Sequence, residues 1–243
     1  MNLKWIFLDL DNTIWDFEAN AADALAELFH RHHLHLKSDY DVHRFIDLYK
    51  SINQEFWRMY EKGHIQKEFL RTQRFTRTFM EMGIPETEHP ENAWEEYLTI
   101  CPTLKKLVPG AREFLENAIK KFSLALITNG FHQTQKGKLS ASELSHFFQF
   151  VLDSEASGFA KPNKEIFHLA LQKADIQPNE AIYVGDTLET DVKGSINSGI
   201  PVIWFNPDQL EIPSDICDNE LFMGSFASLD AIWHFFEENI LSD

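Results

Sequence analysis

Two aspartates stand directly after a short apolar run near the amino terminus. Asp9 and Asp11, separated by one residue, follow Trp5-Ile6-Phe7-Leu8, a continuous apolar stretch of the kind that forms strands buried on both faces. A carboxylate can serve as a nucleophile, as a metal ligand or as a carrier of protons. Two carboxylates at one strand end can therefore divide these tasks within a single site.

Polar segments follow two other predicted strands in the same way. Thr128-Asn129-Gly130 comes after the apolar run 123–127, and Gly185-Asp186-Thr187 comes after the run 181–184. Ligands of open parallel sheets bind beyond the carboxyl ends of the strands, so we expect these segments to meet at one site. Asp186 adds a third hard oxygen ligand to those of Asp9 and Asp11, a set that suits octahedral Mg²⁺.

The same segments offer donors for a phosphate group. The hydroxyl of Thr128, the amides near Asn129 and Gly130, and the ammonium of Lys161 can all donate to phosphoryl oxygens. A cation held by the aspartates would offset the repulsion between a carboxylate nucleophile and a phosphate dianion. Each motif alone is common in turns and solvated loops, but the four in this order indicate a site for phosphoryl transfer.

The elements that must position these residues predict an α/β fold. Five apolar runs alternate with helical patterns at 111–121 and 163–174, which indicates a doubly wound, Rossmann-like parallel sheet. Four consecutive helical patterns interrupt this rhythm and predict an inserted helical cap domain. The expected domains are an α/β hydrolytic core of residues 1–15 and 100–243 and a helical cap of residues 16–99. The predicted strands are 5–8, 123–127, 150–152, 181–184 and 202–205, and the predicted cap helices are 18–33, 41–61, 66–82 and 90–99.

Composition narrows the classes of partner. The chain has 243 residues, with 22 Lys and Arg against 38 Asp and Glu, and its formal net charge is −16. This charge repels polymeric nucleic acid and anionic membranes, but a local cation can still admit a small phosphorylated metabolite. Cys101 and Cys217 lie far apart and lack metal-ligand spacing, which favours a reducing compartment. We expect a cytoplasmic monomer or homodimer with no membrane segment.

The four motifs together resemble those of the haloacid dehalogenase-like hydrolase superfamily, and the resemblance covers nearly the whole chain. The inserted helices are similar to the small cap domain of that superfamily, which follows the first motif. The motifs that carry the resemblance are Asp9-x-Asp11-x-Thr13, Thr128-Asn129-Gly130, Lys161-Pro162 and Gly185-Asp186-x4-Asp191.

The resemblance implies a two-step phosphatase mechanism. Asp9 would attack phosphorus and form an aspartyl-phosphate, while Asp11 would protonate the leaving alcohol and then deprotonate the hydrolytic water. Mg²⁺ would be held by Asp9, the backbone carbonyl of Asp11 and Asp186, with Asp191 as a further or water-mediated ligand. The phosphoryl oxygens would be bound by Thr128, Asn129 and Lys161.

The identity of residue 11 separates phosphatases from dehalogenases within this superfamily. Dehalogenases attack carbon and have no use for a proton shuttle, so Asp11 favours phosphorus chemistry. The segments 127–131, 158–167 and 184–191 further resemble the branch of pyrimidine nucleoside monophosphate phosphatases, which implies substrates such as dUMP, UMP and dTMP. A phosphatase or phosphomutase for a sugar phosphate or phosphoglycolate shares the motifs, and an Asp-phosphorylated signalling module is the alternative outside enzymes.

Substrate specificity is expected from the linker, the cap and the second motif. The candidate substrate contacts are Phe17, Asn20, Gly130 and Phe131, and Trp15 of the linker is a further aromatic that can meet a base. Lys67, Arg71, Arg74 and Arg77 share a helix face at intervals of three and four residues. We interpret them as a solvated basic face in preference to an anion site, and we expect the histidines 30, 32, 33 and 35 to be exposed.

Overall fold

The computed structural model describes residues 2–241 and divides the chain into two compact units. One unit runs up to Phe17 and resumes at Lys105, and the other is Glu18–Leu104. Among the described residues, every helix is too short or too polar to pass through a bilayer.

The first unit is built on one sheet of parallel strands, as the sequence predicted. Its strand order is β3-β2-β1-β4-β5-β6, and every neighbouring pair is parallel. The chain adds strands on one side of β1 and then on the other, so the order reverses between β1 and β4, where open sheets bind their ligands. The strands are β1 Trp5–Leu8, β2 Ser123–Thr128, β3 Phe150–Asp153, β4 Ala181–Gly185, β5 Val202–Phe205 and β6 Phe222–Phe226.

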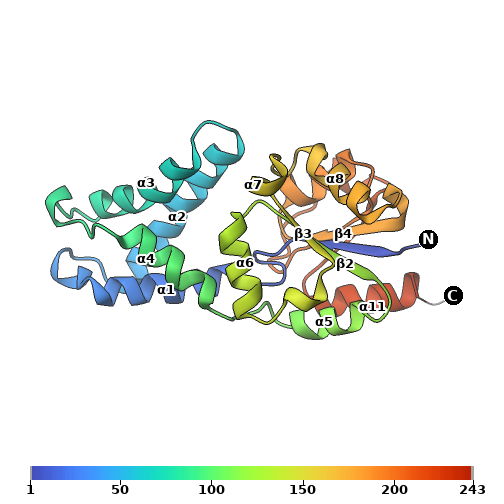
Figure 1. The fold of residues 1–243 in the computed structure, drawn as a ribbon, viewed down its shortest axis with the longest axis horizontal. Coiled ribbons are helices and arrows are strands. Elements are labelled where there is room, and N and C mark those ends of the chain that lie inside the picture. The colour runs from blue at the N-terminus through green and yellow to red at the C-terminus, as the bar shows by residue number, and fades with distance from the viewer. Residues whose placement is uncertain (1, 242–243) are drawn as a thin grey trace. The chain divides into compact units, whose positions relative to one another are not determined.

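Helices cover both faces of this sheet, with α8 on one side and α5 with α11 on the other (Figure 1). Because side chains of a strand alternate between faces, Phe7 packs in the cluster that contains Phe167 of α8. The helices of this unit are α5 Ala111–Ala118, α6 His132–Ala141, α7 Ser154–Ser157, α8 Lys164–Ala174, α9 Lys193–Asn197, α10 Ser214–Cys217 and α11 Leu229–Asn239, with a π-helical turn at Leu188–Val192.

The edge strand β6 is absent from the five strands that the sequence predicted. All five of its residues are only half-buried, and Gly224 has a φ of 135°. A glycine inside a short strand weakens the pattern on which strand prediction depends. The sheet therefore has six strands, one more than the apolar runs indicate, and the additional strand lies at an edge.

The second unit contains helices and, among its described residues, no strand of the sheet. Its helices match the four predicted helical patterns: α1 Phe17–Arg31, which begins at the last residue of the first unit, α2 Val42–Glu61, α3 Lys67–Glu81 and α4 Ala93–Ile100. Aromatic rings fill the space between α2, α3 and α4, including Phe45, Tyr49, Phe75, Phe79 and Tyr97.

The predicted solvated basic face of α3 is wrong at Arg74. This side chain is 3 % exposed, its Nη1 donates to Asn53 Oδ1 at 2.7 Å, and its guanidinium lies over aromatic rings. Arg77 is exposed and pairs with two glutamates, as expected of a surface arginine. The physical reason is helical periodicity, because Arg74 lies four residues from the buried Leu70 and Thr78 on the apolar stripe. The histidine tract is exposed at residues 30, 33 and 35, as predicted, and half-buried at His32.

Gly194 of α9 provides the close packing under the loop that carries Lys161. A Cβ at this position would lie 2.8 Å from Phe167 Cε2 and 3.1 Å from Pro162 Cα. The backbone of residue 162 cannot move away as a flexible side chain can, so added volume here strains the loop.

Gly194→Ala is expected to lower the free energy of unfolding by about 1 to 3 kcal/mol, because overpacking outweighs the gain in helix propensity. Urea unfolding followed by circular dichroism measures the change. Asn197→Ala on the exposed side of the same helix is the matched control and should stay within about 0.5 kcal/mol of wild type. An unchanged midpoint for Gly194→Ala would show that the loop adapts to the extra methyl group.

Candidate active site

The loop after β1 carries both aspartates of the first motif to the carboxyl edge of the sheet. The Asp9 amide donates to Val184 O at 3.0 Å, which continues the pairing of β1 with β4. The chain then turns tightly, with the Trp15 amide donating to Leu10 O and the Asn12 amide donating to Trp15 O, both at 2.8 Å. Asp9 is therefore fixed at the point where the strand order reverses.

Three carboxylates converge at this edge. Oxygens of Asp9, Asp186 and Asp191 lie within 4.8 Å of one another, and this is the one such acidic group among residues 2–241. Asp186 follows β4, accepts from Thr13 Oγ1 at 3.2 Å, and its carbonyl accepts from Trp204 Nε1 at 2.8 Å. Clustered carboxylate oxygens are the ligands that Mg²⁺ prefers, so this donor set fits the cation that the sequence predicted.

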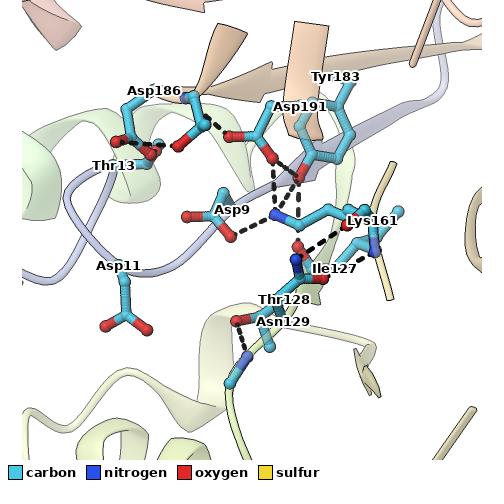
Figure 2. A network of polar contacts seen from close by, with 12 residues as sticks. Asp9, Asp11, Thr13, Ile127, Thr128, Asn129, Lys161, Tyr183, Asp186 and Asp191 are labelled. Atoms are coloured by element: carbon cyan, nitrogen blue, oxygen red, sulfur yellow. Dashed lines mark hydrogen bonds and ion pairs between the residues drawn. The ribbon is translucent and has the colours of Figure 1, made fainter. Parts of the chain in front are cut away.

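Lys161 is buried among these carboxylates with 2 % exposure. Its Nζ donates to Asp9 Oδ1 and to Asp191 Oδ1, both at 2.6 Å, and to Tyr183 Oη at 2.9 Å, as Figure 2 shows. One ammonium against three carboxylates leaves a formal charge of 1 − 3 = −2 if all are ionised. Buried charge of this kind needs a partner, and a divalent cation would neutralise it.

Tyr183 also takes part in this network, although it was not predicted from the sequence. Its hydroxyl lies 3.0 Å from Asp191 Oδ1 and 3.2 Å from Ile127 O, in addition to its contact with Lys161. The sequence contains a signal for this role: a tyrosine within the apolar run 181–184 is expected to be buried, and its buried hydroxyl then needs a polar partner.

Burial and like charge shift the ionisation of the cluster. Burial raises the pKa of Asp9 to about 7, and Asp191 and Asp11 act in the same direction against Lys161. Burial, followed by Asp191 and Asp9, raises the pKa of Asp186 well above its ordinary value. Burial opposes the charge of Lys161, but Asp191 and Asp9 outweigh it and raise its pKa well above the ordinary value. Near and below pH 7, protons therefore compete with a cation for the carboxylate of Asp9.

The second motif, Thr128-Asn129-Gly130, connects β2 to the loop that carries Lys161. Thr128 is buried at the end of β2, and its Oγ1 accepts from the Gly130 amide at 3.2 Å. Asn129 Nδ2 donates to Lys161 O at 3.0 Å, and its Oδ1 accepts from the Lys161 amide at 2.7 Å (Figure 2). The side chain of Asn129 therefore clamps the backbone of Lys161, and a contact of Asn129 with a phosphoryl oxygen would use its main-chain N–H.

The expected substrate contacts lie in different surroundings. Phe131 is 3 % exposed and precedes α6, Phe17 and Gly130 are half-buried, and Asn20 is fully buried in the second unit. Trp15 has no exposed surface in the structure and so offers no open face for stacking on a base. Contacts of Phe17, Asn20, Gly130 and Phe131 with a substrate stay predictions.

Asp11 differs from the other aspartates because its carboxylate is engaged by α6. Lys138 Nζ donates to Asp11 Oδ1 at 2.6 Å, and Gln135 Nε2 donates to Asp11 Oδ2 at 2.9 Å. Neither side chain was predicted from the sequence. Their spacing of three residues on one helix, directly after the second motif, was the signal that could have found them.

Magnesium is expected to stabilise the protein more at pH 7.5 than at pH 5. A carboxyl whose pKa is higher in the folded than in the unfolded chain makes stability fall as pH rises, here from about 4 through about 7 for Asp9. Bound Mg²⁺ removes this loss because it replaces the proton.

Urea midpoints at the two pH values, with EDTA and with excess Mg²⁺, measure this effect. Asp9→Asn is the control, since it lacks the titrating group and should show a weaker dependence of the Mg²⁺ effect on pH. A stabilisation by Mg²⁺ that is equal at both pH values would contradict the competition between protons and cation.

The chain matches known proteins over nearly its full length. It is 32 % identical over 218 residues to the pyrimidine 5'-nucleotidase YjjG of Escherichia coli, covering 89 % of this chain and 92 % of that one. It is 30 % identical over 213 residues to the pyrimidine 5'-nucleotidase PynA of Streptococcus pneumoniae, covering 87 % of each. The magnesium-bound crystal structure of the HAD-hydrolase YfnB of Bacillus subtilis superimposes with a TM-score of 0.84 at 28 % identity, covering 98 % of this chain and 100 % of that one.

The family model of haloacid dehalogenase-like hydrolases matches residues 3–199. That range contains the three converging carboxylates, Lys161 and the whole second unit. These matches confirm the resemblance that the four motifs carry: the chain belongs to the haloacid dehalogenase-like hydrolase family.

Proposed function

We propose that the chain is a Mg²⁺-dependent phosphomonoester hydrolase that uses Asp9 as its nucleophile. The observation that carries this proposal is the buried contact of Asp9 with Lys161 at 2.6 Å, beside two further carboxylates at the edge of β1 and β4. Lys161 holds one oxygen of the Asp9 carboxylate in place and supplies a fixed positive charge for a bound phosphoryl group. The magnesium-bound relative supports the choice of cation.

The residues of this chain can perform two balanced steps. In the first step a carboxylate oxygen of Asp9 bonds to phosphorus, the ester P–O bond breaks, and Asp11 gives its proton to the leaving alkoxide. In the second step a water molecule gives a proton to Asp11 and attacks phosphorus, which releases inorganic phosphate and restores the Asp9 carboxylate. Thr128 and Lys161 bind the phosphoryl oxygens throughout.

The cation would be held by Asp9, Asp186 and the backbone carbonyl of Asp11, and when bound it would neutralise the charge of the phosphoryl oxygens. Asp191 is fully buried, and both of its oxygens already accept protein hydrogen bonds, from Lys161 Nζ and from the Thr187 amide. We therefore assign Asp191 a water-mediated role that also fixes Lys161.

The substrates that we propose are pyrimidine nucleoside monophosphates such as dUMP, UMP and dTMP. Two relatives of about 30 % identity that match along their length are pyrimidine 5'-nucleotidases, which supports this choice over a sugar phosphate or phosphoglycolate. In this proposal residues 1–15 and 100–243 form the hydrolytic core in the cytoplasm, and residues 16–99 form the cap.

Asp9→Asn is expected to reduce phosphate release from dUMP to below about 0.1 % of the wild-type rate, because the amide cannot attack phosphorus. Release of inorganic phosphate in the presence of Mg²⁺ measures the rate, and a thermal melt confirms that the variant is folded. A folded Asp9→Asn variant with substantial activity would reject Asp9 as the nucleophile.

A panel of phosphomonoesters is expected to show the highest kcat/KM for pyrimidine nucleoside monophosphates, with EDTA abolishing turnover. The panel includes purine nucleotides, sugar phosphates and phosphoglycolate. A preference of about tenfold or more for a sugar phosphate, about 1.4 kcal/mol, would replace the nucleotidase assignment and leave the phosphatase chemistry intact.

A further inference from the structure

Helix α6 holds the carboxylate of Asp11 with two buried side chains. Lys138 Nζ donates to Oδ1 at 2.6 Å and Gln135 Nε2 donates to Oδ2 at 2.9 Å, so each carboxylate oxygen has its own donor. The side chain of Lys138 is 4 % exposed and that of Asp11 is 26 % exposed. Two donors on separate oxygens fix the direction of the carboxylate as well as its position.

The ammonium of Lys138 lies over two aromatic rings. Its Nζ lies 4.5 Å from the ring centroid of Trp15 and 5.4 Å from that of Phe17. Trp15 is fully buried and bridges to Leu107, so it forms a rigid wall for the lysine. An ion pair in such surroundings is ordered, unlike a solvent-exposed salt bridge, and cation–π contact adds to its stability.

Gln135 connects Asp11 to the phosphate donor of the second motif. Its Nε2 also donates to Thr128 Oγ1 at 2.7 Å, so the two hydrogens of one amide serve the two acceptors. The Thr128 hydroxyl accepts a second hydrogen bond from the Gly130 amide. A hydroxyl has two lone pairs and one proton, so with both lone pairs engaged its proton is directed at a third partner.

The buried Oε1 of Gln135 has no hydrogen-bond partner. Leaving a buried carbonyl without a partner is unfavourable. The amide thus donates to both Asp11 and Thr128 while its own carbonyl stays without a hydrogen bond.

The carboxylate of Asp11 is also kept apart from the cation ligands. It is not part of the group formed by Asp9, Asp186 and Asp191, and in Figure 2 it points away from Asp9. A mobile carboxylate two residues from the nucleophile would be drawn to a divalent cation, and a carboxylate bound to the cation cannot carry a proton.

We propose that Lys138 and Gln135 are positioning residues that hold the Asp11 carboxylate away from the cation for proton transfer, and that Gln135 aims the Thr128 hydroxyl at the phosphoryl group. This inference rests on the proposed function. It predicts a defect confined to leaving groups that need a proton, because a phenolate such as p-nitrophenolate departs unassisted whereas the alkoxide of dUMP does not.

The test compares kcat/KM for dUMP and for p-nitrophenyl phosphate, which reports the steps up to departure of the alcohol. Lys138→Met is expected to lower kcat/KM for dUMP about 10²-fold. The same variant should lower kcat/KM for p-nitrophenyl phosphate by less than about tenfold. Lys138→Arg should recover most of the dUMP activity. Lys136→Met, on the exposed side of α6, is the matched control and should change neither value.

Gln135→Met is expected to weaken inhibition by inorganic phosphate about fivefold, because the Thr128 hydroxyl loses the donor that orients it. Lys138→Met should leave phosphate inhibition unchanged. Equal losses on both substrates, or phosphate inhibition that is unaffected in Gln135→Met, would overturn the assigned roles.

Thermal melts identify any variant that fails to fold, and Lys138→Gln then replaces Lys138→Met with the same ratio deciding the outcome. Failure of the proposed function is distinguishable from failure of this inference, because it shows in the wild type. If the wild type cleaves p-nitrophenyl phosphate but not dUMP, only the nucleotidase assignment falls, and the alkyl phosphate that it does cleave takes the place of dUMP.

Discussion

The ion pairs of Lys161 with Asp9 and Asp191 are the interaction on which the rest of the site depends. They connect the end of β1 and the π-helical turn after β4 to the loop before α8, and they join segments separated by 152 and 30 residues. Because all three side chains are buried, loss of one partner would leave an uncompensated charge inside the protein. The hydrogen bonds of Tyr183 with Lys161 and Asp191, and those of Asn129 with the backbone of Lys161, keep this arrangement in one geometry.

Much of the fold and of this cluster could be predicted because two relevant patterns can be recognised in short segments of the sequence. Continuous apolar runs mark buried parallel strands, and the polar residues that follow them must lie at one edge of the sheet. Asp9 and Asp186 follow these patterns and lie close together as expected, whereas Lys161 reaches them from the loop before α8. Edge strand β6 was not predicted because a glycine interrupts its apolar pattern. The burial of Arg74 was not predicted because a charged residue occupies the apolar stripe of its helix.

The partners of the supporting residues could not be predicted, because packing between distant elements determines which groups meet. Lys138 meets Asp11 across 127 positions of sequence, and Tyr183 meets Lys161 across 22. No motif spacing connects such pairs. The two aspartates of the first motif consequently look alike in the sequence, yet one lies buried beside other carboxylates and the other is held by α6. Different surroundings for two like groups are what allow them to take different chemical roles.

The glycines of two motifs leave space for the side chains that support the site. Gly130 is a candidate substrate contact, and a Cβ at this position would overlap the side-chain amide of Gln135. A Cβ on Gly185 would lie 2.5 Å from Asp191 Cγ. In each case the absent side chain makes room for a residue that positions the site. Packing around the chemical groups therefore constrains these motifs independently of any direct contact with a ligand.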